Sequence, residues 1–181
     1  MSEDSLRWET LDTTVPYRCE GFDIRRDRVR LPDGSETAYD YLVDEPSVVV
    51  IPFTSSGDVV VIDEWRQAVD GVRRGFPAGG IEGSDDSLAA AAHRELEEET
   101  GYVADTVEPL TTVEPANGIA NAVHHYFVAS DCVRNGSQRL DHDESIRVDR
   151  TDLDRLREQV ADGTIRDGRT VLGLLYYDWL G

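Results

Sequence analysis

The chain has 181 residues, with 37 acidic and 18 basic side chains, so its formal net charge is −19 at pH 7. This length accommodates one domain with a sizeable core and a small appendage. The charge argues against binding to nucleic acid or to an anionic membrane, because no basic face is available to neutralise phosphates.

All 18 basic residues are arginine, and lysine is absent. We interpret this composition as an adaptation to a cytoplasm rich in salt, where repulsion between carboxylates is screened within about 3 Å at 1 M salt. An acidic protein from an ordinary cytoplasm is the alternative. Cys19 and Cys132 predict two buried, reduced thiols, and no signal peptide is expected, so the predicted location is cytoplasmic. The longest apolar stretch, residues 48–53, is too short to span a bilayer.

Alternating apolar residues and turn residues predict strands in the first third of the chain. Residues 20–30 and 36–43 alternate around Leu31-Pro-Asp-Gly34, which predicts a hairpin. Residues 48–53 form an apolar run typical of a buried strand, and a glycine turn leads into another strand at 59–62.

The rest of the chain predicts three helices among further strands. The expected elements, in chain order, are a helix at 87–100, strands at 103–113, 123–129 and 146–148, and helices at 151–160 and 170–179. Thr151 and Asp154 form a capping box for the second helix. This order predicts an α/β fold in which a mixed sheet is sandwiched between helices. We divide the chain into an N-terminal β segment, residues 1–45, and a main domain, residues 46–181.

The predicted helix at 87–100 carries carboxylates on one flank. Ser87 can cap its start, and Gly101 suits the left-handed position after its end. Three glutamates share one side of this helix: Glu95, Glu98 and Glu99. Like charges at this spacing destabilise a helix by roughly 0.2–0.5 kcal/mol per pair, whereas a divalent cation converts the repulsion into coordination. Carboxylate oxygens select Mg²⁺ or Mn²⁺ over zinc. A solvated acidic face is the alternative.

The residues around this helix match a longer pattern. The matching positions are Gly80, Arg94, Glu95, Leu96, Glu98, Glu99, Gly101 and Tyr102. The pattern resembles the box of the Nudix hydrolases, with Asp86 in place of the first glutamate of the box. In that family this residue props the loop before the helix, and the resemblance implies the same role for Asp86. Gly79 is the alternative to Gly80 as the first box residue, because relatives with Pro-Ala-Gly start the box at that glycine.

Other stretches resemble the ADP-ribose pyrophosphatase branch of the Nudix hydrolases. They are the Leu-Pro-Asp-Gly turn within residues 22–45, Glu64-Trp65-Arg66, Pro77-Ala78-Gly79 and the stretch from Gly163 to Asp167. The resemblance implies a Nudix fold, a homodimer, and an N-terminal segment that contributes to dimerisation and to the substrate site. The loop at 115–122 lacks the carboxylate that these relatives carry, so the preferred sugar nucleotide stays open.

The resemblance places a catalytic centre on the predicted helix. The expected metal ligands are Glu95, Glu98, Glu99 and a backbone carbonyl of Ala78 or Gly79. Arg94 can pair with Glu98 one turn further on, so Arg94, Glu95 and Glu98 are grouped as catalytic residues. A carboxylate from a later loop is expected to be the general base; the candidates are Asp141, Asp143 and Glu144, which the sequence does not rank, and Glu144 is our working choice.

Substrate contacts are expected from Arg66 and from the backbone at Ala78, Gly79 and Gly80. The guanidinium of Arg66 matches phosphate oxygens, and a structural ion pair with Glu64 or with the glutamates of the helix is its alternative.

Two kinds of side chain allow a functional or a structural interpretation. Trp65 or Tyr17 can stack on a base or sugar, whereas buried packing is the commoner fate of such residues. His124 and His125 lie on a predicted strand, where packing or exposure is commoner than catalysis.

These features predict a Mg²⁺-dependent hydrolase that cuts the diphosphate of a nucleoside-diphosphate sugar, with ADP-ribose as first choice, into AMP and a sugar phosphate. Two alternatives remain. One is a Nudix-fold domain that binds or senses a nucleotide sugar without hydrolysing it, and the other is a pyrophosphohydrolase of modified nucleoside triphosphates.

Overall fold

The computed structural model describes residues 5–19 and 21–180 and divides into two compact units. The first unit comprises Met1–Glu45 and Glu114–Val123, and the second comprises Pro46–Val113 and His124–Gly181. The chain therefore leaves the first unit at Pro46, returns to it for one loop, and ends in the second.

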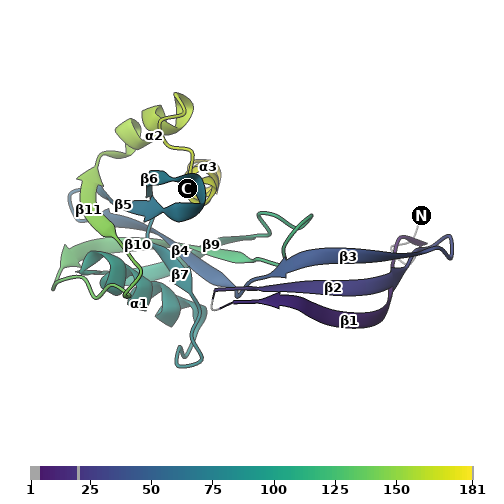
Figure 1. Ribbon diagram of the computed structural model, residues 1–181. Coiled ribbons are helices and arrows are strands. Elements are labelled where there is room, and N and C mark those ends of the chain that lie inside the picture. The colour runs from purple at the N-terminus through teal and green to yellow at the C-terminus, as the bar shows by residue number, and fades with distance from the viewer. Residues whose placement is uncertain (1–4, 20, 181) are drawn as a thin grey trace. The chain divides into compact units, whose positions relative to one another are not determined.

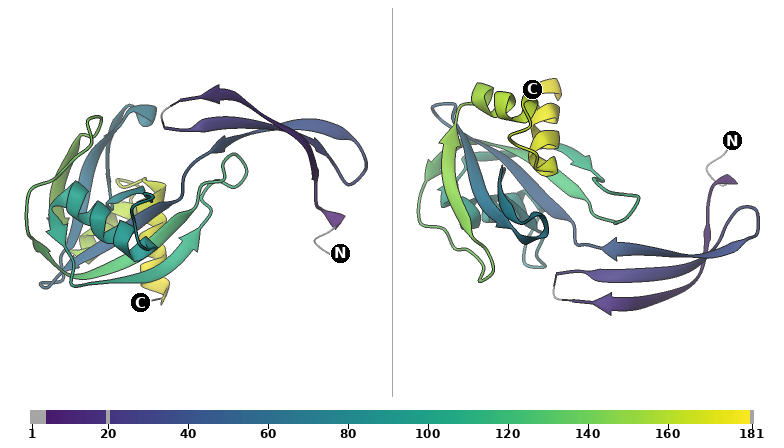
Figure 2. Two further views of the ribbon diagram at one scale, coloured as in Figure 1. Left: turned by 90° about the horizontal axis from the view of Figure 1, so that it is seen from below. Right: turned by 45° about the horizontal axis from the view of Figure 1, so that its top comes forward.

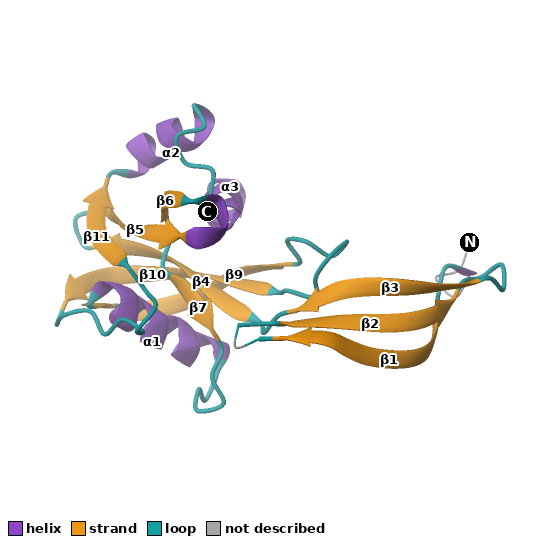
Figure 3. Ribbon diagram, in the orientation of Figure 1, coloured by secondary structure: helices purple, strands orange, loops and turns teal. Residues whose placement is uncertain are grey.

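The first unit contains a three-stranded antiparallel sheet in the order β1-β2-β3 (Figure 3). Its strands are β1 (Glu9–Arg18), β2 (Asp23–Arg30) and β3 (Glu36–Val43). The predicted hairpin is confirmed as β2 and β3, and Gly34 has the positive φ of 86° that its tight turn requires. β1 was not predicted, because two irregularities of register, one of them between Thr14 and Tyr17, break its alternation.

Charged side chains form a ladder across this first sheet. Arginines of β2 pair with acids of β1 and β3: Arg26 with Asp40 at 2.6 Å, Arg28 with Glu36 at 3.0 Å, and Arg30 with Glu9 at 2.6 Å. The partners are largely exposed, so each pair contributes little to the stability of the sheet.

The loop at 114–123 belongs to the first unit because it bonds to β3 and the residues after it. Leu42 N donates to Ile119 O at 2.9 Å, the Tyr39 hydroxyl donates to Gly118 O at 2.6 Å, and Asp44 N donates to Asn121 Oδ1 at 2.9 Å. The first of these bonds accompanies an isolated parallel bridge between Leu42 and Ala120.

The second unit is built on one mixed sheet. Its strands are β4 (Ser47–Thr54), β5 (Val59–Arg66), β6 (Gly71–Gly75), β7 (Ala78–Gly80), β8 (Tyr102–Val103), β9 (Thr106–Val113), β10 (His124–Arg134) and β11 (Ile146–Thr151). The order is β11-β5-β4-β10-β8, with β6 on β5, β7 on β4 and β9 on β10. Only the central pairing of β4 with β10 is parallel among the described strands, so the predicted mixed sheet is confirmed.

Helices cover both faces of this sheet. They are α1 (Leu88–Thr100), α2 (Leu153–Ala161) and α3 (Gly168–Leu180), with a short 3-10 helix at Gln67–Val69. Figures 1 and 2 show α1 on one face and α2 with α3 on the other, which confirms the predicted sandwich. None of the helices in the described ranges has the length and apolar character needed to traverse a bilayer.

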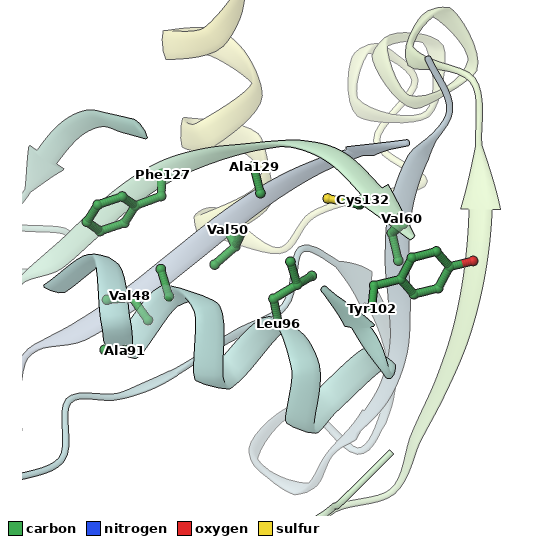
Figure 4. Close-up of a cluster of buried hydrophobic side chains, with 10 residues drawn as sticks. Val48, Val50, Val60, Ala91, Leu96, Tyr102, Phe127, Ala129 and Cys132 are labelled. Atoms are coloured by element: carbon green, nitrogen blue, oxygen red, sulfur yellow. The ribbon is translucent and has the colours of Figure 1, made fainter. Parts of the chain in front are cut away.

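The core has two layers because β4 is buried on both faces. Val48 and Val50 pack with Leu96 of α1 in one cluster (Figure 4). Val49 and Ile51, which alternate with them, face the opposite cluster, to which α2 and α3 contribute Leu156 and Leu174. A continuous apolar run is what a strand with two buried faces requires. This packing against β4 fixes the position of α1 on the sheet.

Several predicted details are corrected by the structure. The predicted strand at 103–113 is two strands, β8 and β9, with Asp105 N bonded to Ser130 O at 3.1 Å between them. The cap of α2 is Asp152, whose side chain accepts from Arg155 N at 2.8 Å, whereas Thr151 ends β11. Cys132 is buried as predicted, but Cys19 is only half-buried.

Candidate active site

Helix α1 presents its acidic flank because its other side is anchored in the core. Its caps are those predicted: the Ser87 side chain accepts from Ala90 N at 3.1 Å, and Gly101 has φ 71° while its N–H donates to Glu97 O. Leu96 and Ala92 are fully buried against the sheet. The helix therefore cannot rotate, and the positions of its glutamates are fixed by packing.

Glu95 lies directly over the backbone of Gly79. A Cβ built at Gly79 would collide with the Glu95 carboxylate, whereas a Cβ at Gly80 would meet nothing within 4 Å. Only glycine therefore allows this close approach at position 79. Of the two glycines left open by the sequence, Gly79 is the one on which the acidic helix depends. Both lie in the short strand β7, paired with β4, and not in the predicted loop.

Glu99 is the most deeply buried carboxyl of the flank, with 3% of its surface exposed. Its Oε2 accepts a hydrogen bond from Ala78 N at 2.9 Å. Burial raises the pKa of Glu99 to about 8, with smaller contributions from the charges of Glu95, Glu64 and Glu144 and against the effect of the Ala78 hydrogen bond. Four carboxyl groups are therefore close enough to oppose one another's ionisation, and Glu99 favours its neutral form unless a cation is nearby.

Arg94 connects the flank to the loop before the helix. Its guanidinium donates to Glu95 Oε1 at 2.7 Å, to Glu98 Oε2 at 3.1 Å, to Gly80 O at 2.7 Å and to Asp85 Oδ2 at 2.9 Å. The predicted pairing with Glu98 is confirmed. These bonds hold the pKa of Arg94 above its ordinary value, the largest contribution coming from Asp85.

The loop is propped by Asp85, and the prediction of this role for Asp86 is wrong. The Asp85 carboxylate receives two bonds from Arg94 and one from Glu82 N at 2.8 Å, while Asp86 is exposed. The pKa of Asp85 is lowered by these bonds, Arg94 first. The wrong assignment arose because Gly80 was taken as the first residue of the box. If Gly79 is the first residue, the acidic position of the box falls on Asp85, and the spacing from there to Arg94 is one residue longer than in the family pattern.

Glu64 is a buried carboxyl that the sequence did not single out as functional. It lies near the end of β5 with 7% of its surface exposed, and it pairs with Arg66 at 2.6 Å. Burial raises its pKa, while the charge of Arg66 lowers it in part. The signal that was available is its place at the end of the run Val59-Val-Val-Ile-Asp-Glu64, where a carboxylate follows a fully buried strand. The ion pair weighed as the alternative for Arg66 is present.

Among the three candidate bases, Glu144 alone is half-buried, while Asp141 and Asp143 are exposed. Its Oε2 accepts from Asp141 N at 3.0 Å. Its charge raises the pKa values of Glu64, Glu95 and Glu99, so it lies within electrostatic reach of all three. The structure thus brings Glu144 to the acidic flank from a loop about 45 residues further along the chain.

The structure decides in part between the functional and the structural interpretations of the aromatic residues and histidines named above. Trp65 and Tyr17 are 44% and 54% exposed, so the expectation of buried packing is wrong for both. His125 Nδ1 lies 3.1 Å from Thr112 Oγ1, and the ring of His124 lies 6.4 Å from that of Tyr126. Both histidines are half-buried, in keeping with packing on β10.

The chemistry of this donor set fits a hard divalent cation. Glu64, Glu95 and Glu99 are buried acids, and Glu98 and Glu144 are half-buried. Carboxylate oxygens of this kind bind Mg²⁺ and Mn²⁺ in preference to softer metals. Within residues 5–19 and 21–180, no three acidic, histidine or cysteine side chains already converge as they do around a bound ion. Glu95 and Glu98 are held by Arg94 and Glu99 by Ala78 N, so a cation has to compete with these bonds.

The fold is a mixed sheet between helices, with an acidic helix packed over the short glycine strand β7. The NUDIX domain model matches residues 44–171 of the chain. This protein therefore belongs to the NUDIX family, and the family resemblance read from the sequence is confirmed.

Similar proteins cover most of the chain. An ADP-ribose pyrophosphatase from Bacillus subtilis is 26% identical over 173 residues, which span 95% of this chain and 93% of the relative. A methanol dehydrogenase activator from Bacillus methanolicus is 29% identical over 169 residues, or 93% and 91% of the two chains. A GDP-mannose pyrophosphatase from Klebsiella pneumoniae is 33% identical over 131 residues, or 68% and 65%.

A solved structure shares the fold. The crystal structure of an ADP compounds hydrolase matches with a TM-score of 0.84 and 21% identity, covering 96% of this chain and 94% of that one. This similarity confirms the predicted Nudix fold.

Proposed function

We propose that the protein hydrolyses the diphosphate of a nucleoside-diphosphate sugar, with ADP-ribose as first candidate, to a nucleoside monophosphate and a sugar phosphate. The observation that carries this proposal is the set of buried carboxyls around Glu95 and Glu99, pressed against a backbone without a side chain at Gly79. Relatives named ADP-ribose pyrophosphatase and GDP-mannose pyrophosphatase support the substrate class.

Glu95, Glu98 and Glu99 would hold the divalent cation, which we propose to be Mg²⁺, with a backbone carbonyl of Ala78 or Gly79 as a further ligand. Bound there, the cation supplies Lewis-acid stabilisation of phosphate oxygens and lowers the pKa of water. Arg94 keeps Glu95 and Glu98 oriented from one side.

The other proposed site residues bind the substrate or accept a proton during the reaction. Arg66 donates hydrogen bonds to a phosphate group, for which its planar guanidinium is suited. The backbone of Ala78, Gly79 and Gly80 borders the same cluster. Glu144 accepts the proton of the attacking water as the new P–O bond forms, and the bridging P–O bond breaks with its electrons on the leaving phosphate.

The setting of the enzyme is also a proposal. We propose that it works as a homodimer in a salt-rich cytoplasm, with the N-terminal β segment contributing to dimerisation and to the substrate site. The 18 arginines without lysine and the net charge of −19 support the salt-rich setting. In the first unit, a hollow of about 360 Å³ lined by Tyr39, Tyr41 and the 114–123 loop supports a substrate contribution.

Product analysis tests the reaction. The purified protein, with Mg²⁺ and a panel of nucleoside-diphosphate sugars, is expected to release nucleoside monophosphate and sugar phosphate in equal amounts. Retained binding without any product would replace the proposal by a regulatory domain, which the similarity to an activator protein also favours. Pyrophosphate released from a nucleoside triphosphate, with the sugars untouched, would indicate a nucleotide-pool enzyme.

Single substitutions test the metal ligands. Glu98→Gln and Glu99→Gln are each expected to lower kcat at least about 100-fold, since loss of a residue that only supports a ligand already costs about 10–100-fold. Glu97→Gln is the matched control, because Glu97 lies on the same helix, is 40% exposed and makes only a long ion pair with Arg139 at 3.5 Å. Full activity in both test variants would contradict the ligand assignment.

A further inference from the structure

The charged residues at the start of α3 form a cluster that the reaction outlined above does not use. A narrow opening of about 10 Å³ is lined by four arginines and by the carboxylates of Glu64 and Asp167. Two of the arginines are engaged elsewhere, Arg73 with backbone carbonyls and Arg74 with carboxylates. The other two come from separate elements and meet at this opening: Arg66 from the end of β5, and Arg169 as the second residue of α3.

The guanidinium of Arg169 has hydrogen-bond donors that are not used within the described part of the protein. Its contact with Asp167 is long, at 3.8 Å from Nε to Oδ1, and beyond the range of a hydrogen bond. Asp167 is already occupied, because its Oδ2 accepts from Thr170 N at 2.9 Å and from the Thr170 hydroxyl at 2.7 Å. Within the described residues the Arg169 side chain donates no hydrogen bond, although about three-quarters of its surface is buried. A guanidinium carries five donors, so this one is available to a ligand.

The two guanidinium groups oppose each other. Burial lowers the pKa of Arg66, and the next largest cause is the charge of Arg169. Each of the other arginines whose pKa departs from the ordinary value has it raised by acidic or hydroxyl partners. Two positive charges at the opening are thus close enough to oppose each other, which an anionic ligand would relieve.

The start of α3 is held rigidly, so the position of Arg169 is defined. Phe76 N donates to Thr170 Oγ1 at 3.0 Å, which ties the first turn of α3 to the end of β6. Gly75 allows this contact, because a Cβ there would lie 2.6 Å from Thr170 Oγ1. The N-terminus of a 13-residue helix also adds a partial positive charge at the same place.

We propose that Arg169 is a second phosphate-binding residue, which together with Arg66 binds the diphosphate of the substrate. The inference rests on the proposed function for the identity of the ligand. Glu64 connects this pair of arginines to the acidic flank, because it pairs with Arg66 at 2.6 Å and its charge helps to raise the pKa of Glu99.

Binding of inorganic pyrophosphate without metal tests the proposal independently of turnover. The protein is titrated with pyrophosphate in EDTA at fixed salt, and binding is followed by calorimetry. Arg169→Gln is expected to weaken binding at least about 10-fold, and Arg169→Lys to recover part of the loss, because an ammonium keeps the charge without the fork of donors. Arg166→Gln is the matched control: it is exposed, three residues away, and makes the same change in net charge.

Two results would overturn the proposal. One is equal binding by Arg169→Gln and Arg166→Gln; the other is a wild-type protein that does not bind millimolar pyrophosphate. Where the protein hydrolyses nucleotide sugars, Arg169→Gln is expected to raise KM about 10-fold with kcat within about twofold of wild type. Absence of all hydrolysis would refute the proposed function while the metal-free titration still decides on Arg169. An unchanged thermal midpoint for Arg169→Gln confirms that the variant is folded.

Discussion

At the scale of single residues, the burial of Glu99 has a consequence for pH. Its pKa in the folded state is raised to about 8, so between its unfolded value and pH 8 the folded state holds a proton that the unfolded state has lost. Stability from this group is therefore complete at low pH and is lost as the pH rises towards 8.

We expect the thermal midpoint of the metal-free protein to fall more steeply between pH 5 and pH 8 than that of Glu99→Gln, which cannot ionise. The two should differ by at least about 3 °C at pH 8, since 1 kcal/mol corresponds to roughly 2–4 °C in a domain of this size. Calorimetry in EDTA measures this. Added Mg²⁺ should raise the wild-type midpoint at pH 8 and leave the variant nearly unchanged; parallel pH curves for both proteins would refute the assignment.

The corrected role of Asp85 is equally open to test. Asp85→Asn removes the charge that receives two bonds from Arg94, so the guanidinium keeps its bonds to Glu95, Glu98 and Gly80 O only. We expect activity to fall about 10-fold or more, as is typical when a residue that orients ligands is lost. Asp86→Asn, one residue along on the surface, is the control and should behave like wild type. Equal effects of the two substitutions would restore Asp86 to the role that the sequence suggested.

At the scale of elements, the loop that carries Glu144 is tied to the end of α1. Gln138 Nε2 donates to Glu99 O at 2.7 Å and to Ile146 O at 3.3 Å, and Arg139 N donates to Glu98 O at 2.8 Å. The last carbonyls of a helix have no partners within it, so these bonds satisfy them. The same bonds set the distance between the proposed base and the proposed ligands.

Gln138→Leu is therefore expected to lower kcat about 10-fold while KM stays within twofold, because the substrate contacts are elsewhere. The thermal midpoint should fall by about 4–8 °C, the effect of two hydrogen bonds. Steady-state kinetics and calorimetry measure the two effects, with Ser137→Ala as the neighbouring control. A change in KM without a change in kcat would show that the loop binds substrate and does not position the base.

What the sequence predicted at this scale follows from local rules. The caps of α1, its buried Leu96 and its pairing of Arg94 with Glu98 are all consequences of helical spacing and were foreseen. The short strand β7 was missed, because three residues of alanine and glycine carry no strand pattern and pair with β4 only through tertiary structure. Glu64 was missed because only the folded structure brings it near the acidic flank of α1, and the periodicity of apolar residues in the sequence gives no information on such contacts.

At the scale of the molecule, the excess of carboxylates governs the response to salt. With a net charge of −19, repulsion between acidic side chains opposes the compact state, and added salt screens it. The exposed ion pairs of β2 are weakened by the same screening, but each contributes little.

We expect the thermal midpoint to rise by several degrees between 0.1 M and 2 M KCl if the salt-rich setting is correct. Measuring at equal concentrations of KCl and of a neutral osmolyte separates charge screening from general exclusion of solute from the protein surface. A midpoint that falls with KCl would favour the ordinary acidic protein.

The position of the 114–123 loop beside β3 could not be predicted from the sequence, since it depends on hydrogen bonds between residues almost 80 positions apart.

The contact between Gly79 and Glu95 means that a very small mutation at position 79 would have a large effect on the site. A single base change converts a glycine codon to an alanine codon, and the added methyl group would displace the carboxylate above it. The change adds no charge and leaves the hydrophobic layers in place, so the product should be a folded protein that has lost the arrangement of its acidic helix over β7.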